Sequence, residues 1–445
     1  MKKKSSILMI LILILYFSAL SPLSNIFLNE RTQRAYKNIT PVLSISDSAV
    51  YEWNRTWGGT GYDIGWGVAT DSSNNIYSVG MTESFGTGLT DMVLVKYDDS
   101  GVQQWNQTWG GNETDIGYGV VVDSSNNIYS VGMTLSFGKG NEDLILVKFD
   151  SSGVQQWNRT WGGSGLEECV GVAVDSLDNI YLTGDTNSFG AGTYDMILIK
   201  YDSSGVQQWN RTWGAANVDT GIGLAVDSSD HIYISGYTRS FGAGATDAIL
   251  VKYDSFGEQQ WNLTWGGAQN DNAYGIIVDS NDNIYLAGGT DSFGAGYLDA
   301  FLIKYDASGV QQWNRTWGGS FQEQAFGLAL DSSGNIYLTG STGSFGMGDG
   351  DMFLLKYDSS GVLQWNITWG GIFPDTSFAI SIDSEDNVYL EGYIDTIETL
   401  ADMVTVKFSK PQERVSPGVP GFNLIVVISS MSLIVIIMAK KKIRR

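Results

Sequence analysis

Apolar and β-branched side chains are concentrated in four short runs that recur in the same order along most of the chain. In the second copy these runs cover residues 117–123, 128–134, 143–149 and 154–161, which we name strands A, B, C and D. Each run is rich in β-branched or aromatic residues and is bounded by Asp, Ser, Asn and Gly, which favour turns. The pattern therefore predicts an all-β unit of four antiparallel strands.

Two tight links in each unit have a signature of their own. In the second copy the A-to-B link reads Asp-Ser-Ser-Asn-Asn and the C-to-D link reads Asp-Ser-Ser-Gly. Both fit a type I turn that ends in a left-handed residue, a conformation that Gly, Asn and Asp adopt at little cost. We therefore interpret the acids at these two links as turn formers.

A Trp-Asn-x-Thr-Trp-Gly motif on strand D marks the repeat. Its seven copies start 52 residues apart, at Trp53, Trp105, Trp157, Trp209, Trp261, Trp313 and Trp365. A fixed period of this length is typical of units that bury their apolar faces against their neighbours. Seven units of four antiparallel strands predict a seven-bladed β-propeller, with the tryptophans packed between blades.

The two ends of the repeat array are out of phase with the blades. A strand of type D, residues 51–57, comes before the first strand A, and the array ends after a strand of type C, residues 403–408. Pairing these two strands would complete the last blade and remove two exposed sheet edges. We therefore expect the N-terminal strand to close the ring.

Strand A carries an alternation of small and large side chains. In the first repeat residues 65, 67 and 69 are Gly, Gly and Ala, whereas residues 66, 68 and 70 are Trp, Val and Thr. Blades converge near the axis of a propeller, so we expect a small face of one strand A to pack against a large face of the next.

These features resemble the SBBP (seven-bladed beta-propeller) repeat family over about four fifths of the chain. The residues that carry the resemblance in the second repeat are Val122-Asp123-Ser124-Ser125-Asn126-Asn127-Ile128-Tyr129, Gly132, Asp143, Lys148, Gly153 and Trp161-Gly162-Gly163. The resemblance implies the propeller fold and a secreted or surface protein, without implying a reaction.

The sequence predicts different segments on either side of the repeats. We expect a signal peptide at 1–24, a linker at 25–49, the propeller at 50–409, a second linker at 410–421, a transmembrane or sorting helix at 422–439 and a basic cytoplasmic tail at 440–445. Pro420-Gly421-Phe422 resembles the start of an archaeal PGF-type sorting tail, which would imply cleavage of this helix. Either way, the expected location is the extracellular face of the cell membrane.

The net charge is −22, which argues against a nucleic acid as partner. Seven of the acids stand at the same position, just before strand A: Asp63, Asp115, Glu167, Asp219, Asp271, Glu323 and Asp375. One hypothesis is a ring of carboxylates that attracts calcium or a cationic ligand. The alternative, which we favour, is that each acid accepts backbone N–H bonds or pairs with a Lys that recurs in every repeat.

Asn-x-Thr sequons recur on strand D and are candidate N-glycosylation sites in a secreted chain. They lie at Asn54, Asn106, Asn158, Asn210, Asn262, Asn314 and Asn366, with two more outside the repeat pattern at Asn38 and Asn112. Because strand D is the outermost strand of a blade, sugars there would point into solvent.

The D-to-A and B-to-C loops are longer and more varied than the two tight links, and binding residues are usually carried by such loops. We therefore expect a cell-surface binding or scaffold protein that recognises a protein or a carbohydrate through this face. The seven-fold regularity offers no unlike groups for catalysis, so no catalytic residue, cofactor or confirmed metal is predicted and the protein is not expected to be an enzyme. An extracellular lyase or hydrolase acting at the same face is the alternative.

Overall fold

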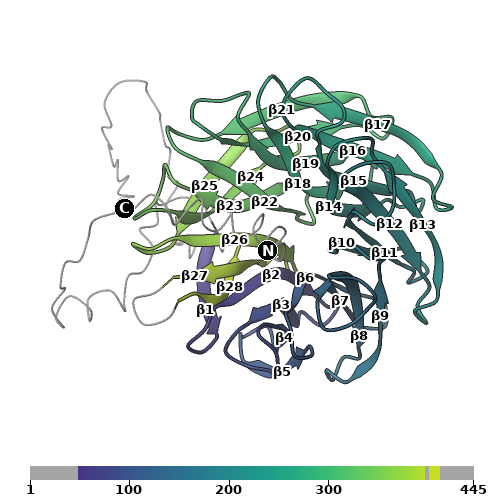
Figure 1. Ribbon diagram of the computed structural model, residues 1–445. Helices are drawn as coiled ribbons and strands as arrows, with labels where there is room; N and C mark the ends of the chain where they lie inside the picture. Colours follow the sequence, from purple (N-terminus) through teal and green to yellow (C-terminus); the bar gives the residue numbers. More distant parts are fainter. Residues whose placement is uncertain (1–48, 396–399, 411–445) are drawn as a thin grey trace, which may run out of the picture. The chain divides into compact units, whose positions relative to one another are not determined.

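The computed structural model describes residues 49–395 and 400–410, and within these ranges it contains 28 β-strands and no helix. The strands form seven antiparallel sheets of four, arranged as blades around a central axis (Figure 1). The predicted all-β, seven-bladed propeller is therefore confirmed. Blade 1 contains β2 to β5, and the count continues to blade 7, which contains β26 to β28 and β1.

Each blade uses one strand of every type. The innermost strands, type A, are β2 (Asp63–Thr70), β6 (Asp115–Val122), β10 (Glu167–Val174), β14 (Asp219–Val226), β18 (Asp271–Val278), β22 (Glu323–Leu330) and β26 (Asp375–Ile382). Type B strands are β3 (Ile76–Thr82), β7 (Ile128–Thr134), β11 (Ile180–Thr186), β15 (Ile232–Thr238), β19 (Ile284–Thr290), β23 (Ile336–Thr342) and β27 (Val388–Ile394).

The outer half of each blade follows the same order. Type C strands are β4 (Asp91–Tyr97), β8 (Asp143–Phe149), β12 (Asp195–Tyr201), β16 (Asp247–Tyr253), β20 (Asp299–Tyr305), β24 (Asp351–Tyr357) and β28 (Asp402–Ser409). The outermost strands, type D, are β5 (Gln103–Trp109), β9 (Gln155–Trp161), β13 (Gln207–Trp213), β17 (Gln259–Trp265), β21 (Gln311–Trp317), β25 (Leu363–Trp369) and β1 (Val50–Trp57).

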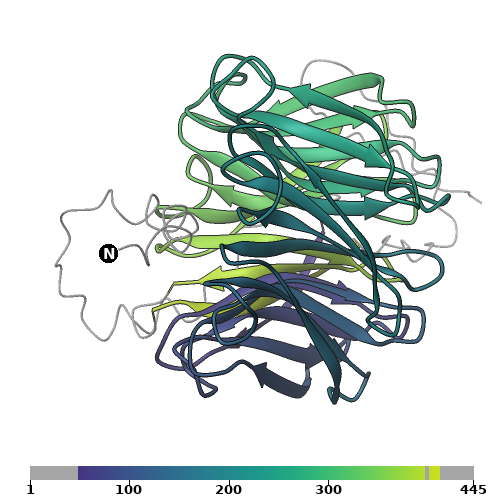
Figure 2. The same ribbon diagram turned by 45° about the vertical axis from the view of Figure 1, so that its right-hand side comes forward.

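The N-terminal strand closes the ring, as expected. The sheet of blade 7 has the order β1-β28-β27-β26, and the register of β1 with β28 runs from Val50 opposite Ser409 to Trp57 opposite Met403. The purple strand β1 lies beside the yellow-green strands of blade 7 in both views (Figure 2). Closure gives the last blade the same four strands as the other six.

The predicted signal peptide, C-terminal helix and basic tail lie outside the described residues, as does Asn38. Among the residues that are described, none belongs to a helix long and apolar enough to cross a membrane.

The tight links are turns centred on an aspartate. In blade 1, Asp71 Oδ1 accepts the backbone N–H groups of Ser73 and Asn75 at 2.8 and 2.9 Å, and its Oδ2 accepts the hydroxyl of Tyr77 at 3.0 Å. The fourth residue of the link, Asn74, has φ of 60°, and its counterparts in the other blades are also left-handed. Gly153 in a C-to-D link has φ of 85°. These values confirm the predicted turn chemistry.

Strand A differs from the predicted alternation because it contains a β-bulge. In β2 the register shifts between Gly65, which lies opposite Gly80, and Gly67, which lies opposite Val79, so Trp66 is an extra residue. A Cβ on Gly65 would meet Glu391 of blade 7, and one on Gly67 would meet backbone of blade 2. The two glycines thus face opposite neighbours, whereas strict alternation would have placed them on one face.

The hydrophobic core lies between blades rather than within one. A representative cluster joins Tyr129 and Leu146 of blade 2 to Ile180, Leu182 and Ile199 of blade 3. Such shared clusters bury the faces of each blade against its neighbours, which is the main source of stability in a repeat architecture.

The tryptophan motif fastens each blade to the next. Trp53 of blade 7 packs on Gly101 of the blade 1 C-to-D turn, and Arg55 Nε donates to the Gly101 carbonyl at 2.6 Å. Trp57 contacts Phe85 of blade 1 with ring centroids 5.0 Å apart. Equivalent Trp–Phe contacts occur at five further blade junctions. The predicted packing of the tryptophans between blades is confirmed.

Substitutions at two glycines can measure how much the contact between the tryptophan and the C-to-D turn contributes to stability. A Cβ on Gly153 would lie 2.9 Å from the ring of Trp105, whereas one on Gly334 would meet nothing within 4 Å, although both glycines are left-handed. Because asparagine tolerates this conformation, Gly153→Asn should lower the free energy of unfolding by roughly 1–3 kcal/mol through overpacking. Gly334→Asn should change it little. Urea unfolding of both variants measures the difference, and equal losses would contradict this assignment.

Candidate functional site

The seven recurrent acids are buried and occupy the first position of each strand A, where they accept hydrogen bonds from the D-to-A loops. Their exposed fractions range from 0% to 3%. Asp115 is typical: its Oδ2 accepts the backbone N–H of Gly111 at 2.8 Å and the hydroxyl of Ser136 at 2.6 Å. The same bond from a backbone N–H four residues earlier occurs in all seven copies.

This geometry matches the favoured alternative, in which the acids accept backbone N–H bonds. The recurrent lysines pair elsewhere, as Lys200 does with Asp175 at 3.5 Å. Within residues 49–395 and 400–410, no three His, Cys, Asp or Glu side chains are grouped so that they could hold a metal ion. Attraction of a cation to the ring as a whole stays a prediction.

The seven-fold pattern breaks at the next position along strand A. Its occupants are Ile64, Ile116, Glu168, Thr220, Asn272, Gln324 and Thr376. Register pairing places Asp185 of β11 directly opposite Glu168, and Tyr237 of β15 directly opposite Thr220. Two carboxyl groups on opposite residues of an antiparallel pair repel each other when both are ionised. Blade 3 therefore carries a pair of acidic groups that no other blade repeats at these positions.

Residues of blades 2 and 4 complete what we name the axial cluster: Tyr118, Glu142, Glu168, Asp185, Thr220 and Tyr237. Tyr118 of blade 2 interacts with Glu168, and burial together with Glu168 and Glu142 raises the pKa of Tyr118 well above its usual range. Burial, with Asp185 and Glu167 nearby, raises the pKa of Glu142 to about 7. The cluster thus joins three blades at the end of the propeller that carries the D-to-A and B-to-C loops, which we name the loop face.

The two paired carboxyls have raised pKa values for the same reasons. Burial, followed by the charge of Glu142, raises the pKa of Glu168, and burial followed by the charge of Glu168 raises that of Asp185. Both side chains nevertheless keep part of their surface exposed. These carboxyls therefore keep their protons to a higher pH than an ordinary surface carboxyl does.

Seven buried polar atoms on the innermost two strands have no hydrogen-bond partner within the described residues. They are Asp63 Oδ1, Trp66 Nε1, Glu168 Oε1, Thr220 Oγ1, Asn272 Oδ1, Ser341 Oγ and Glu391 Oε1. Unpaired buried polar groups are uncommon because each loses its hydration without compensation. They lie on blades 1 and 3 to 7, so a ligand near the axis could supply hydrogen bonds that the described residues do not make.

An aromatic belt follows the rest of the axis. The bulge residues of strands A contact one another from blade to blade, with ring centroids 5.2 Å apart for Tyr274–Phe326, 5.3 Å for Phe326–Phe378, 4.2 Å for Phe378–Trp66 and 5.7 Å for Trp66–Tyr118. Blades 3 and 4 interrupt the belt with Val170 and Ile222. The polar groups of the axial cluster stand beside this interruption.

A different buried carboxyl lies at the junction of blades 7 and 1. Glu391 Oε2 accepts the hydroxyls of Ser78 at 2.6 Å and Thr405 at 2.7 Å, and burial raises the pKa of Glu391 well above its usual range. No acidic neighbour contributes to this raised pKa, so Glu391 serves below as a control carboxyl outside the axial cluster.

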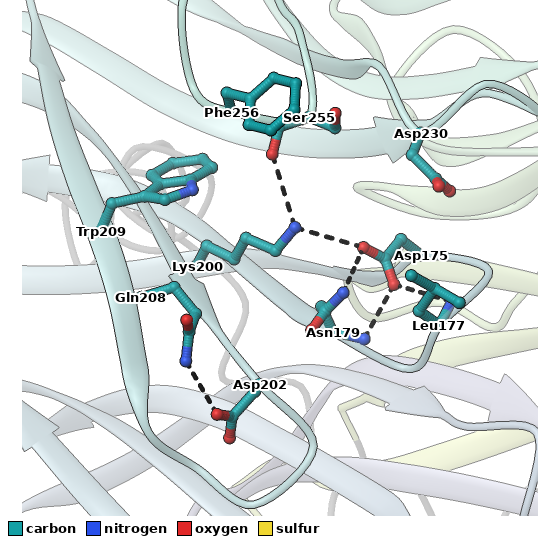
Figure 3. Close-up of a pocket in the computed structure, with 10 residues that line it drawn as sticks. All are labelled: Asp175, Leu177, Asn179, Lys200, Asp202, Gln208, Trp209, Asp230, Ser255 and Phe256. Carbon is teal, nitrogen blue, oxygen red and sulfur yellow. Dashed lines mark hydrogen bonds and ion pairs between the residues drawn. The ribbon is translucent and has the colours of Figure 1, made fainter.

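A pocket of about 440 Å³ lies on the opposite end of the propeller, the turn face, between blades 3 and 4. Figure 3 shows Lys200 inside it, bonded to Asp175 and to the Ser255 carbonyl, contacts that recur at other blade junctions. Two apolar side chains distinguish this copy: Leu177 and Phe256 are 74% and 76% exposed where most repeats carry serine. The sequence pattern predicted little variation in the tight links of this face, and neither residue was singled out.

The sequon asparagines lie where the sequence predicted, on the outermost strands. All those on strand D except Asn54 are exposed, and Asn54 is partly exposed; Asn112 is exposed on its loop. Modification itself stays a prediction. We expect an intact mass above the sequence mass that falls after deglycosylation of protein purified from its native host, and an unchanged mass would contradict it.

Comparison with known proteins supports the assignment to the β-propeller class. The fold and repeat define a β-propeller, and the SBBP beta-propeller repeat model matches residues 163–190 and 324–346. The chain is 30% identical over 174 residues to the regulatory protein FlaEY of Caulobacter vibrioides, covering 34% of this chain and 18% of that protein. It is 21% identical to an uncharacterized WD repeat-containing protein of Acanthamoeba polyphaga mimivirus, covering 78% of this chain and 31% of the other. The chain thus spans less than a third of either relative.

Solved structures share the fold at low identity. A polysaccharide lyase, Uly1, has a TM-score of 0.48 and 10% identity over 77% of this chain and 89% of its own. A puromycin hydrolase has a TM-score of 0.49 and 11% identity over 81% and 55%. The Pan2 WD40 domain of Neurospora crassa has a TM-score of 0.46 and 10% identity over 78% and 90%. These identities support the fold and no activity.

The expectation that the protein is not an enzyme is corrected by these findings. It rested on seven-fold regularity and on the absence of unlike groups at one place. Enzymes are frequent among the structural neighbours of this propeller. The axial cluster, moreover, brings carboxyl, phenol and hydroxyl groups together from three blades. Regularity of the scaffold is therefore no argument against an enzyme.

The axial cluster should reduce stability at neutral pH. A carboxyl whose pKa is raised by folding stays protonated while the unfolded chain releases its proton, so stability falls as pH rises from the ordinary carboxyl range toward the raised pKa. Glu168→Gln should therefore unfold at a higher urea concentration than wild type at pH 8 and at a similar one at pH 4. Each pKa unit between folded and unfolded states corresponds to about 1.4 kcal/mol. Glu83→Gln, which alters an exposed loop carboxyl, is the control, and equal midpoints at pH 8 would refute the prediction.

Proposed function

We propose that this protein is a surface-anchored binding or scaffold propeller that recognises a protein or a carbohydrate on its loop face, at the axial cluster. The observation that carries the proposal is the break in symmetry there: blades 2 to 4 supply unlike polar groups to one place, on a scaffold that is otherwise repeated. Binding sites are commonly a few specific polar groups beside apolar and aromatic surface, held by rigid elements. The axial cluster beside the aromatic belt has this composition.

The location at the extracellular face of the membrane is part of the proposal. Its support is the apolar and basic patterning of residues 1–24 and 422–445 and the exposed sequons on strand D. The fold itself is one that mediates protein interactions in relatives of known structure, such as the BBS1 N-terminal region in complex with ARL6. A protein partner is consistent with that precedent.

A lyase or hydrolase acting at the same face is the second candidate. The specific observation in its favour is the raised pKa of Glu142, about 7, in a cluster that also contains two tyrosines. A group that titrates near neutral pH can act as a general acid or base. Turnover of a polysaccharide or ester by wild type, lost in Glu142→Gln, would favour this candidate over simple binding.

A pull-down with the full chain tests the binding proposal. The bait would be wild type, a loop-face variant with Glu168→Gln and Asp185→Asn, and a turn-face variant with Leu177→Ser and Phe256→Ser. We expect cell-surface protein or polysaccharide to be retained by wild type and the turn-face variant, and retention to fall at least about tenfold in the loop-face variant, because charged hydrogen bonds are lost. Loss in the turn-face variant alone would move the site to the pocket of Figure 3.

A further inference from the structure

The axial cluster carries acidic groups without a basic partner. None of the ion pairs recorded within the described residues involves Glu142, Glu168 or Asp185. Arg239 of blade 4 influences Tyr237, but its side chain is exposed at the loop face. A buried acidic group without a positive partner keeps its proton to a higher pH, because unpaired charge in a low-dielectric site is costly. A positively charged ligand would allow these carboxyls to ionise.

Unpartnered hydrogen-bonding atoms give an independent sign of a ligand. Thr220 is only 8% exposed, and its Oγ1 lies near Asp185 and Tyr237 without a hydrogen bond of normal geometry to either. Glu168 Oε1 is likewise buried and unpartnered on the neighbouring blade. Both atoms can accept hydrogen bonds, and Glu168 in its ionised form can do nothing else. A ligand that donates N–H groups would satisfy them.

We propose that the axial cluster binds an ammonium group, with Glu168, Asp185 and Thr220 accepting its N–H bonds from two adjacent blades. An ammonium group has three donors directed away from one another, which suits acceptors on separate strands. A guanidinium group would instead favour the two oxygens of a single carboxylate in its plane. A bare metal ion is disfavoured because the described residues contain no group of three ligands arranged to hold one.

The aromatic belt supports the same chemistry. Trp66 and Tyr118 lie at the end of the belt nearest to Glu168, and Tyr118 interacts with that carboxyl directly. Aromatic faces attract cations, so rings beside the carboxyls favour the same charged group. The remaining surface of the ligand can then lie against the rings of the belt. This inference rests on the proposed function, whose ligand class it specifies. An amino sugar and a lysine side chain are two sources of the same group.

Calorimetric titration of the full chain at pH 7 separates these sources. One arm uses glucosamine against glucose, and the other uses Nα-acetyl-lysine amide against its norleucine analogue. Within each arm the two probes differ mainly by the ammonium group. We expect at least one charged probe to bind at least about tenfold more tightly than its neutral analogue, because a charge-assisted hydrogen bond is lost in the analogue. Equal affinity within both arms would overturn the proposal.

Three variants locate the site. Glu168→Gln should weaken binding of the charged probe at least about tenfold. Thr220→Val should weaken it without lowering the melting temperature, because it removes a hydroxyl that is unpartnered in the free protein. Glu391→Gln removes a buried carboxyl with a raised pKa outside the cluster and should leave binding unchanged. Wild-type affinity in Glu168→Gln, or an equal loss in Glu391→Gln, would contradict the assignment.

The pH dependence provides a further readout. The titratable and charged groups around the two carboxyls are Tyr118, Glu142, Glu167, Cys169, Tyr237 and Arg239. Since an ammonium ligand requires ionised carboxylates, affinity should rise between pH 5 and pH 7 and binding should release protons. Titrations in two buffers of different ionisation enthalpy measure that release, and its absence would contradict the proposed chemistry.

A partner captured by the loop face while both ammonium probes fail would leave the proposed function standing and overturn only this inference.

Discussion

Close approach of neighbouring strands A around the axis is the constraint on which the rest of the propeller depends. Each strand A solves it with a bulge that turns glycines, or other small residues, toward the blades on both sides, as Gly65 and Gly67 do in blade 1. The backbone carbonyl of the extra residue meets the small residue of the preceding blade, as that of Tyr118 does with Gly67. The side chain of the extra residue varies: it is Trp in one repeat, Val or Ile in two others, and Tyr or Phe in four. Backbone packing and side-chain variation thus occur together in the bulge of each strand A.

The separation explains how a regular ring can hold an irregular site. The turns, the tryptophan contacts and the buried acids before strand A recur with little change, so the scaffold gains rigidity from every blade. Unlike polar groups gather near the axis, where Glu168 and Asp185 are register partners in one sheet and Thr220 lies on the next. Strained or unsatisfied groups of this kind are tolerated only where the surrounding structure is over-determined. Such groups lower the free energy of unfolding unless a ligand satisfies them.

Much of this architecture could be predicted from the sequence because the information is local and repeated seven times. Turn chemistry around Asp71 and Gly153, and the phase shift that lets β1 complete blade 7, follow from residue types at fixed spacing. The axial cluster could not be predicted in the same way, because its members come from three repeats and meet only after closure. A usable signal did exist: Glu168 and Asp185 are the only acids at their respective repeat positions. The bulge in strand A was missed because period-two alternation assumes one residue per register step.

Closure by β1 also determines how the ring would respond to mechanical load. Val50 and Ser409 are register partners at the same end of an antiparallel pair. A pull that separates these two residues therefore loads the ladder one hydrogen bond at a time, from that end toward Trp57 and Met403. Hydrogen bonds that break in sequence resist less force than bonds that are sheared together. Blade 7 is consequently the point at which tension between the two ends of the propeller would open the ring, while the six blades formed from continuous chain stay folded.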